Sequence, residues 1–145
     1  MNNKLSNILI SIELNQTKEK DEFIRDKLDQ FINQTIGQDF QYSIYAYDAN
    51  KVIGGIIARR EKSGIFIDIL WIDDNYRYTG IGTNLLKAAE VEAIKHDVKY
   101  STTDTLDFLD FLAVDFYLKN GYSEIGRIAG YVEGHDKVFL RKNLK

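Results

Sequence analysis

The stretch Ile65-Phe66-Ile67-Asp68-Ile69-Leu70-Trp71-Ile72, followed at residues 77–83 by Arg-Tyr-Thr-Gly-Ile-Gly-Thr, decides the fold of this 145-residue chain. The apolar run predicts a strand, the glycines predict a turn, and Asn84-Leu85-Leu86 predicts the start of a helix. At such a junction, unpaired backbone N–H groups and the positive end of the helix dipole converge, which favours a phosphate or pyrophosphate. Arg77 can add a fixed positive charge. The loop therefore predicts a phosphorylated ligand.

Two familiar phosphate-binding patterns do not fit this loop. A dinucleotide fingerprint needs a third glycine where Leu85 stands. A P-loop needs Gly-Lys-Ser or Gly-Lys-Thr, whereas Gly82 is followed by Thr83 and Asn84. One alternative stays open on the heptapeptide alone, namely a strand-to-helix turn whose glycines serve only packing.

Hydrophobic periodicity divides the rest of the chain into short strands and helices. Apolar residues recur at helical spacing between Thr17 and Gly37, after the first strand, and again as far as His96. A third, short helix is predicted at residues 113–120, followed by Gly121, a typical residue just past a helix end. Strands are predicted at residues 7–14, 42–47, 52–58, 65–72, 100–105, 122–128 and 137–141. Hairpins mixed with crossovers predict an α/β (mixed α+β) fold whose sheet is part parallel and part antiparallel.

Composition bounds the possible functions. The net charge of −3 argues against broad nucleic-acid binding, and no apolar run approaches the length of a membrane span. The chain has no cysteine, so disulfides, thiolate metal sites and a cysteine nucleophile are excluded. Neither His96 nor His135 has partners at metal-site spacing. Without a signal-like start, we expect one cytoplasmic domain over residues 1–145, either a monomer or a homodimer, with no metal and no membrane partner.

Two motifs together resemble the GNAT N-acetyltransferase superfamily. Arg-x-x-Gly-x-Gly at residues 77–82, between an apolar strand and Leu85-Leu86, resembles its motif A. Phe116-Tyr117-Leu118-Lys119-Asn120-Gly121-Tyr122 resembles its second signature, a helix-to-strand junction. The resemblance covers residues 40–143. It implies a central mixed parallel and antiparallel sheet flanked by helices.

The resemblance implies acetyl-CoA as cosubstrate. In this superfamily, amides of the glycine loop hold the CoA pyrophosphate. The pantetheine arm pairs with the backbone of the preceding strand where that strand splays from its parallel neighbour. Asn120 is expected to help hold the arm, although a residue near a helix end is equally often a local cap. The implied cosubstrate-binding residues are Leu70, Trp71, Ile72, Arg77, Tyr78, Thr79, Gly80, Ile81, Gly82, Thr83 and Asn120.

Acetyl transfer to an amine needs a proton acceptor and a partner for the leaving thiolate. An alkylamine of pKa about 10.4 is only about one part in 10³ neutral at pH 7. Asp68 is the candidate base, because a carboxylate in an apolar strand is costly unless it is partnered or functional. The alternative is an ion pair with Arg59 or Arg60. Tyr117 matches the signature tyrosine and is expected to hydrogen-bond the thiolate.

The sequence therefore favours an N-acetyltransferase that transfers acetyl from acetyl-CoA to a primary amine of a small molecule or a protein. The amine would attack directly in a ternary complex, without an acyl-enzyme. One alternative is an acyl-CoA-binding module that lacks transferase activity. Another is a structural or partner-binding protein in which the glycines only turn the chain.

Overall fold

The computed structural model describes residues 8–15, 17–36, 40–108 and 113–145, which fall into two compact units, residues 1–38 and 39–145. In the smaller unit, α1 (Lys18–Ile36) confirms the helix expected after Thr17. The expected stop at Gly37 lies outside the described residues. Among the described residues 8–14 no strand forms, so the predicted opening strand is wrong there. Isoleucine-rich sequence favours a strand only where a neighbouring strand pairs with its backbone.

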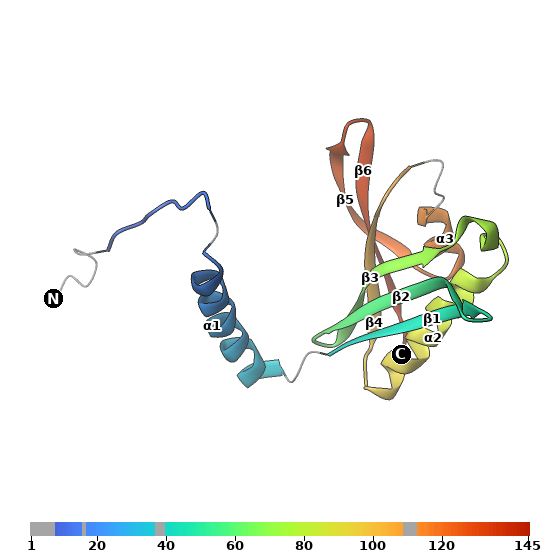
Figure 1. The fold of residues 1–145 in the computed structure, drawn as a ribbon, viewed down its shortest axis with the longest axis horizontal. Helices are drawn as coiled ribbons and strands as arrows, with labels where there is room; N and C mark the ends of the chain where they lie inside the picture. The colour runs from blue at the N-terminus through green and yellow to red at the C-terminus, as the bar shows by residue number, and fades with distance from the viewer. Residues whose placement is uncertain (1–7, 16, 37–39, 109–112) are drawn as a thin grey trace. The chain divides into compact units, whose positions relative to one another are not determined.

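The larger unit is built on one six-stranded sheet (Figure 1). Its strand order is β1-β2-β3-β4-β6-β5, and only the β3–β4 pair is parallel. This arrangement confirms the predicted mixed α/β sheet. The strands are β1 (Gln41–Asp48), β2 (Lys51–Glu61), β3 (Gly64–Ile72), β4 (Tyr100–Leu106), β5 (Ser123–Val132) and β6 (His135–Asn143).

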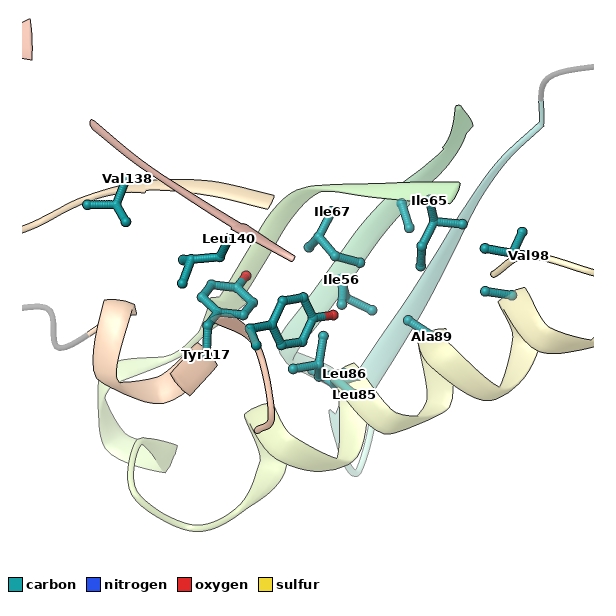
Figure 2. Close-up of a cluster of buried hydrophobic side chains, with 13 residues drawn as sticks. Ile56, Ile65, Ile67, Leu85, Leu86, Ala89, Val98, Tyr117, Val138 and Leu140 are labelled. Atoms are coloured by element: carbon teal, nitrogen blue, oxygen red, sulfur yellow. The ribbon is translucent and has the colours of Figure 1, made fainter. Parts of the chain in front are cut away.

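The hydrophobic core lies between this sheet and α2 (Ile81–Lys95), which contacts β1, β2 and β3. Figure 2 shows Leu86 and Ala89 of α2 directed towards Ile56, Ile65 and Ile67 of the sheet. Alternation along each strand explains this arrangement, because every second side chain points to the helix-covered face. The helix α3 (Ala113–Lys119) contacts β4 and β5 and adds Tyr117 to the core.

The parallel pairing between β3 and β4 stops halfway along β3. It runs from Gly64, opposite Tyr100, to Ile67, opposite Thr103, although β3 continues to Ile72. The antiparallel register with β2 shifts at the same place: Ile67 faces Ala58 and Ile69 faces Ile57. Asp68 is therefore the extra residue of a β-bulge, a feature that bends a strand and increases its twist. The bulge accounts for the separation of β3 from β4 beyond Ile67.

Two classes of feature are absent from the part of the chain that the structure describes. No helix there is both long and apolar enough to cross a membrane. No group of three or more histidine, cysteine, aspartate or glutamate side chains is placed there to hold a metal ion.

Candidate functional site

A cavity of about 690 Å³ opens where β3 separates from β4. Its walls come from β3, the glycine loop, the first turn of α2, β4 and α3. The structure thus brings most of the predicted cosubstrate-binding residues to one place. Those lining the cavity are Leu70, Trp71, Ile72, Arg77, Tyr78, Gly80, Ile81, Gly82 and Thr83. Thr79 and Asn120 are outside its lining.

The glycine loop sets the start of α2 against the cavity. Gly80 is the N-cap residue, with a left-handed φ of 87°, and no side chain caps the helix. The first backbone N–H groups of α2 have no partner within the helix, and the residues that carry them, Ile81, Gly82 and Thr83, line the cavity. Arg77 is ion-paired with Asp74 at 2.7 Å. The loop can therefore present backbone amides, the helix dipole and a guanidinium to an anion.

Gly80 offers a direct test of this loop geometry. Gly80→Ala is expected to lower the free energy of unfolding by about 1–2 kcal/mol, because an L-residue is strained in the left-handed region. A Cβ at Gly80 meets nothing within 4 Å, so no steric clash adds to the strain. Denaturant unfolding measures the change. Gly126→Ala is the matched control, since its Cβ also meets nothing and its φ is not left-handed; an equal loss in both variants contradicts the explanation.

Gly82 has a different role, which is close packing. A Cβ on Gly82 would come 3.3 Å from the ring of Phe116, a residue of α3 that also lines the cavity. The two motifs recognised in the sequence are thus in contact in the fold, one supplying the glycine and the other the ring.

Tyr117 lies in the cavity wall and is only 6% exposed. Its ring is edge-on to Phe116 and to Tyr122, with centroids 5.2 Å away in each case. Burial raises the pKa of the Tyr117 phenol, the Asp104 carboxylate raises it further, and a hydrogen bond with Thr103 acts in the opposite direction. The phenol is therefore protonated at neutral pH and can donate a hydrogen bond.

Asp68 lines the same cavity but is ion-paired with Arg59. Arg59 also binds Glu61 at 2.8 Å and lies over the ring of Phe66, 4.7 Å from its centroid. This is the ion-pair alternative expected from the sequence. A base role for Asp68 stays a prediction.

Asn120 and Thr79 make local contacts. Asn120 Nδ2 donates to the carbonyl oxygen of Phe116 at 2.8 Å, which is the helix-end cap anticipated as the alternative. Thr79 Oγ1 donates to the carbonyl oxygen of Tyr76 at 2.5 Å, bracing the loop. The predicted contacts of both residues with acetyl-CoA stay predictions.

Sequence reasoning missed Thr103, Asp104 and Phe116 as residues of the cavity wall. It predicted a β-branched, polar strand at residues 100–105 and assigned none of these residues to the site. A usable signal was present, because buried strands rarely carry so many hydroxyl and carboxylate groups unless those groups are bonded or functional.

Comparison with known proteins identifies the family. The model of the acetyltransferase (GNAT) domain family matches residues 40–124, more than half of the chain. Blasticidin-S acetyltransferase of Streptomyces morookaense is 28% identical over 104 residues, 71% of this chain and 75% of that protein. The crystal structure of an acetyltransferase from Bacillus cereus superposes with a TM-score of 0.80 at 27% identity, covering 92% of this chain and 97% of the other.

A further solved structure of the same fold contains the cosubstrate. A Bacillus anthracis protein, crystallised in complex with acetyl coenzyme A, has a TM-score of 0.66 and 22% identity, over 77% of this chain and 66% of the other. These matches confirm the resemblance seen in the two sequence motifs. The chain belongs to the GNAT family of acetyltransferases, which use acetyl-CoA as the acetyl donor.

Proposed function

We propose that the protein transfers the acetyl group of acetyl-CoA to a primary amine of a small molecule or a protein, by direct attack in a ternary complex. The observation that carries the proposal is the cavity at the separation of β3 from β4, where three parts of the fold meet: the start of α2, the half of β3 that no longer pairs with β4, and Tyr117. Each of these three parts of the cavity wall suits one part of acetyl-CoA.

The start of α2 suits the pyrophosphate of acetyl-CoA. Its backbone N–H groups and dipole favour an anion, and Arg77 adds charge. Backbone of β3 at residues 70–72 borders the cavity beyond the last pair with β4. Backbone N–H and C=O groups need partners, and the amide groups of a pantetheine arm can supply them. The thioester would then lie near Tyr117.

The reaction balances without a covalent enzyme intermediate. The amine nitrogen attacks the thioester carbonyl carbon, so that a C–N bond forms, the C–S bond breaks and the sulfur leaves with the electron pair. A backbone N–H of β3 would stabilise the oxyanion. The amine loses a proton to a base, for which Asp68 is the candidate, and Tyr117 donates a hydrogen bond to the thiolate.

The first test is binding of acetyl-CoA to the whole chain. At about 100 times the dissociation constant, a ligand that binds only the folded state stabilises it by about 2.7 kcal/mol. We therefore expect the melting temperature to rise with acetyl-CoA concentration, as followed by calorimetry. Acetate at the same concentrations is the control. A melting temperature that does not rise with acetyl-CoA contradicts the assignment of the cavity.

The second test separates an enzyme from a binding module. CoA release is measured with a thiol reagent across a panel of amines: polyamines, aminoglycosides, amino acids, peptides and blasticidin S, which the name of one relative suggests. Amine-dependent release and an acetylated amine detected by mass spectrometry support the proposal. Binding of acetyl-CoA without release for any amine supports the acyl-CoA-binding alternative.

Asp68→Asn tests the proposed base in the same assay. If Asp68 accepts the proton of the amine, kcat falls by about 10²-fold or more, and the remaining activity rises with pH as more of the free amine is neutral. If its role is the ion pair, kcat changes little while the free energy of unfolding falls by at most about 1 kcal/mol, because the pair is partly exposed. Glu61→Gln, which removes the other carboxylate bound to Arg59, is the matched control.

A further inference from the structure

Two aspartates occupy corresponding positions where the sheet opens. Ile67 of β3 and Thr103 of β4 form the last parallel pair. Asp68 and Asp104 are the next residues along these two strands, and both line the cavity. Asp68 is ion-paired with Arg59 of β2 and is the candidate base. The proposed reaction leaves Asp104 without a role, although Asp104 lies at the same opening.

Asp104 lies on the sheet face that does not pack against α2. Its neighbour Thr103 is buried and lies opposite Leu140 of the core, whereas Asp104 lies opposite Phe139 of β6. Adjacent residues of a strand point to opposite faces, so Asp104 points away from the core. Figure 2 shows Leu140 and Tyr117 together in that core. Because Tyr117 and Asp104 both line the cavity, the cavity is bordered from both faces of the sheet.

The Asp104 carboxylate already holds an ammonium group. Lys137 Nζ lies 3.1 Å from Asp104 Oδ1, and it is 4.9 Å from the ring centroid of Tyr131 and 5.8 Å from that of Phe139. The hydrogen bond with Asp104 raises the pKa of Lys137 above its ordinary value. No other residue in the described part of the chain forms a hydrogen bond or an ion pair with this carboxylate. A carboxylate can accept about four hydrogen bonds, and this side chain is 25% exposed, so the cation of a ligand can bind it as well.

We propose that Asp104 determines the acceptor specificity of this acetyltransferase, by binding a second cationic nitrogen of the amine that is acetylated. The inference rests on the proposed function. The acceptor enters from the face of Asp104, its neutral amine reaches the thioester next to Asp68, and its second ammonium binds the Asp104 carboxylate. A charge-assisted hydrogen bond of this kind is about twice as strong as one between neutral groups. The preferred acceptors are therefore small diamines and polyamines, not alkylamines with one amino group.

The kinetic test compares amines that differ by one charge. Putrescine and cadaverine are assayed beside butylamine and pentylamine, which have the same chain lengths and a single amino group. We expect kcat/KM to be at least about tenfold higher for the diamines, the effect of one charge-assisted hydrogen bond. Asp104→Asn, which keeps the size of the side chain, is expected to remove this preference and to leave kcat/KM for the monoamines within about twofold. The preference is a ratio measured on one protein, so it does not depend on the fraction of the variant that folds.

Asp107→Asn is the matched control for the lost carboxylate. Asp107 is also ion-paired with a basic side chain, Arg127 at 3.2 Å, but it does not line the cavity. Lys137→Met removes the ammonium that competes for Asp104, and it is expected to lower KM for the diamines about threefold or more. An unchanged preference in Asp104→Asn, an equal loss of preference in Asp107→Asn, or a higher KM for the diamines in Lys137→Met overturns the proposal.

A second measurement does not need turnover. Putrescine is titrated by calorimetry into the full chain saturated with CoA, and it is expected to bind about tenfold more tightly to the wild type than to Asp104→Asn. Equal affinities overturn the inference. Acetylation of monoamines and diamines with equal kcat/KM also overturns it, while the proposed function stands. Binding of putrescine that depends on Asp104, without release of CoA for any amine, overturns the proposed function instead.

Discussion

Tyr117→Phe is expected to lower kcat by about 10²-fold while leaving KM for acetyl-CoA within about twofold. The substitution keeps the ring between Phe116 and Tyr122 and removes only the hydroxyl. Burial raises the pKa of this phenol, so the hydroxyl stays protonated. In the proposed reaction it would donate to the sulfur as the C–S bond breaks. Since that bond strengthens as charge develops, its loss acts on turnover rather than on binding of the donor.

The expected loss of kcat, about 10²-fold, is attributed to a lost hydrogen bond to the thiolate and not to a lost proton transfer. A phenol of pKa about 10 or above is a weaker acid than a thiol of pKa about 8.5, so transfer to the thiolate is uphill. Initial rates of CoA release at saturating acetyl-CoA give kcat. Tyr122→Phe is the control, because its buried hydroxyl binds Ser101 and Glu90 and Tyr122 is absent from the lining of the cavity. Unchanged turnover in Tyr117→Phe removes the residue from the mechanism.

Glu90→Ala is expected to cause the largest loss of stability, about 3 kcal/mol in the free energy of unfolding. Glu90 of α2 is 7% exposed and pairs with Lys142 of β6 at 2.7 Å. It also accepts a hydrogen bond from Tyr122. Removing the carboxylate leaves a partly buried ammonium and a buried phenol without this partner. The Lys142 side chain is 26% exposed, which keeps the expected loss at the low end for a buried pair.

A double substitution tests the cause. Glu90→Leu combined with Lys142→Met replaces both charges with apolar groups of similar size, and we expect it to recover most of the lost stability. Urea unfolding followed by circular dichroism gives the free energy of unfolding of Glu90→Ala, of the double variant and of a control variant. Lys95→Ala, which removes an exposed ion pair of the same helix with Glu92, is the control and should cost less than about 0.5 kcal/mol. If the double variant is as unstable as Glu90→Ala, the unpaired-charge explanation is wrong.

The parts of the fold predicted correctly from sequence are those set by local patterns. Three such features each depend on a few neighbouring residues: the glycine loop, the α2 face carrying Leu86 and Ala89, and the end of α3 shortly before Gly121. The strand expected at residues 7–14 is absent from the described residues 8–14, because strand formation depends on a partner that composition does not reveal.

The missed features of the site depend on register between distant segments. The sequence offered Arg59 or Arg60 as an ion-pair partner of Asp68, but the bulge at Asp68, and the pairing with Arg59 in particular, follow from how β2 and β3 align. Thr103 lies opposite Ile67 at the last β3–β4 pair, and it reaches the cavity wall, together with Tyr117 of α3, only because distant elements meet there. The sequence predicts a strand at this position, whereas the place of Thr103 in the cavity wall depends on tertiary structure.

Because the β3–β4 pairing ends early, it also affects which amino-acid substitutions in β3 the protein can tolerate. If β3 meets its cosubstrate through peptide groups, side-chain scanning along residues 70–72 reports little, since every residue except proline supplies the same N–H. Replacing single amides there with esters removes one N–H donor at a time and keeps the side chains unchanged. Selection would then act on the path of the main chain more than on the identity of the side chains at residues 70–72. Relatives only 28% identical can share a donor under that kind of constraint.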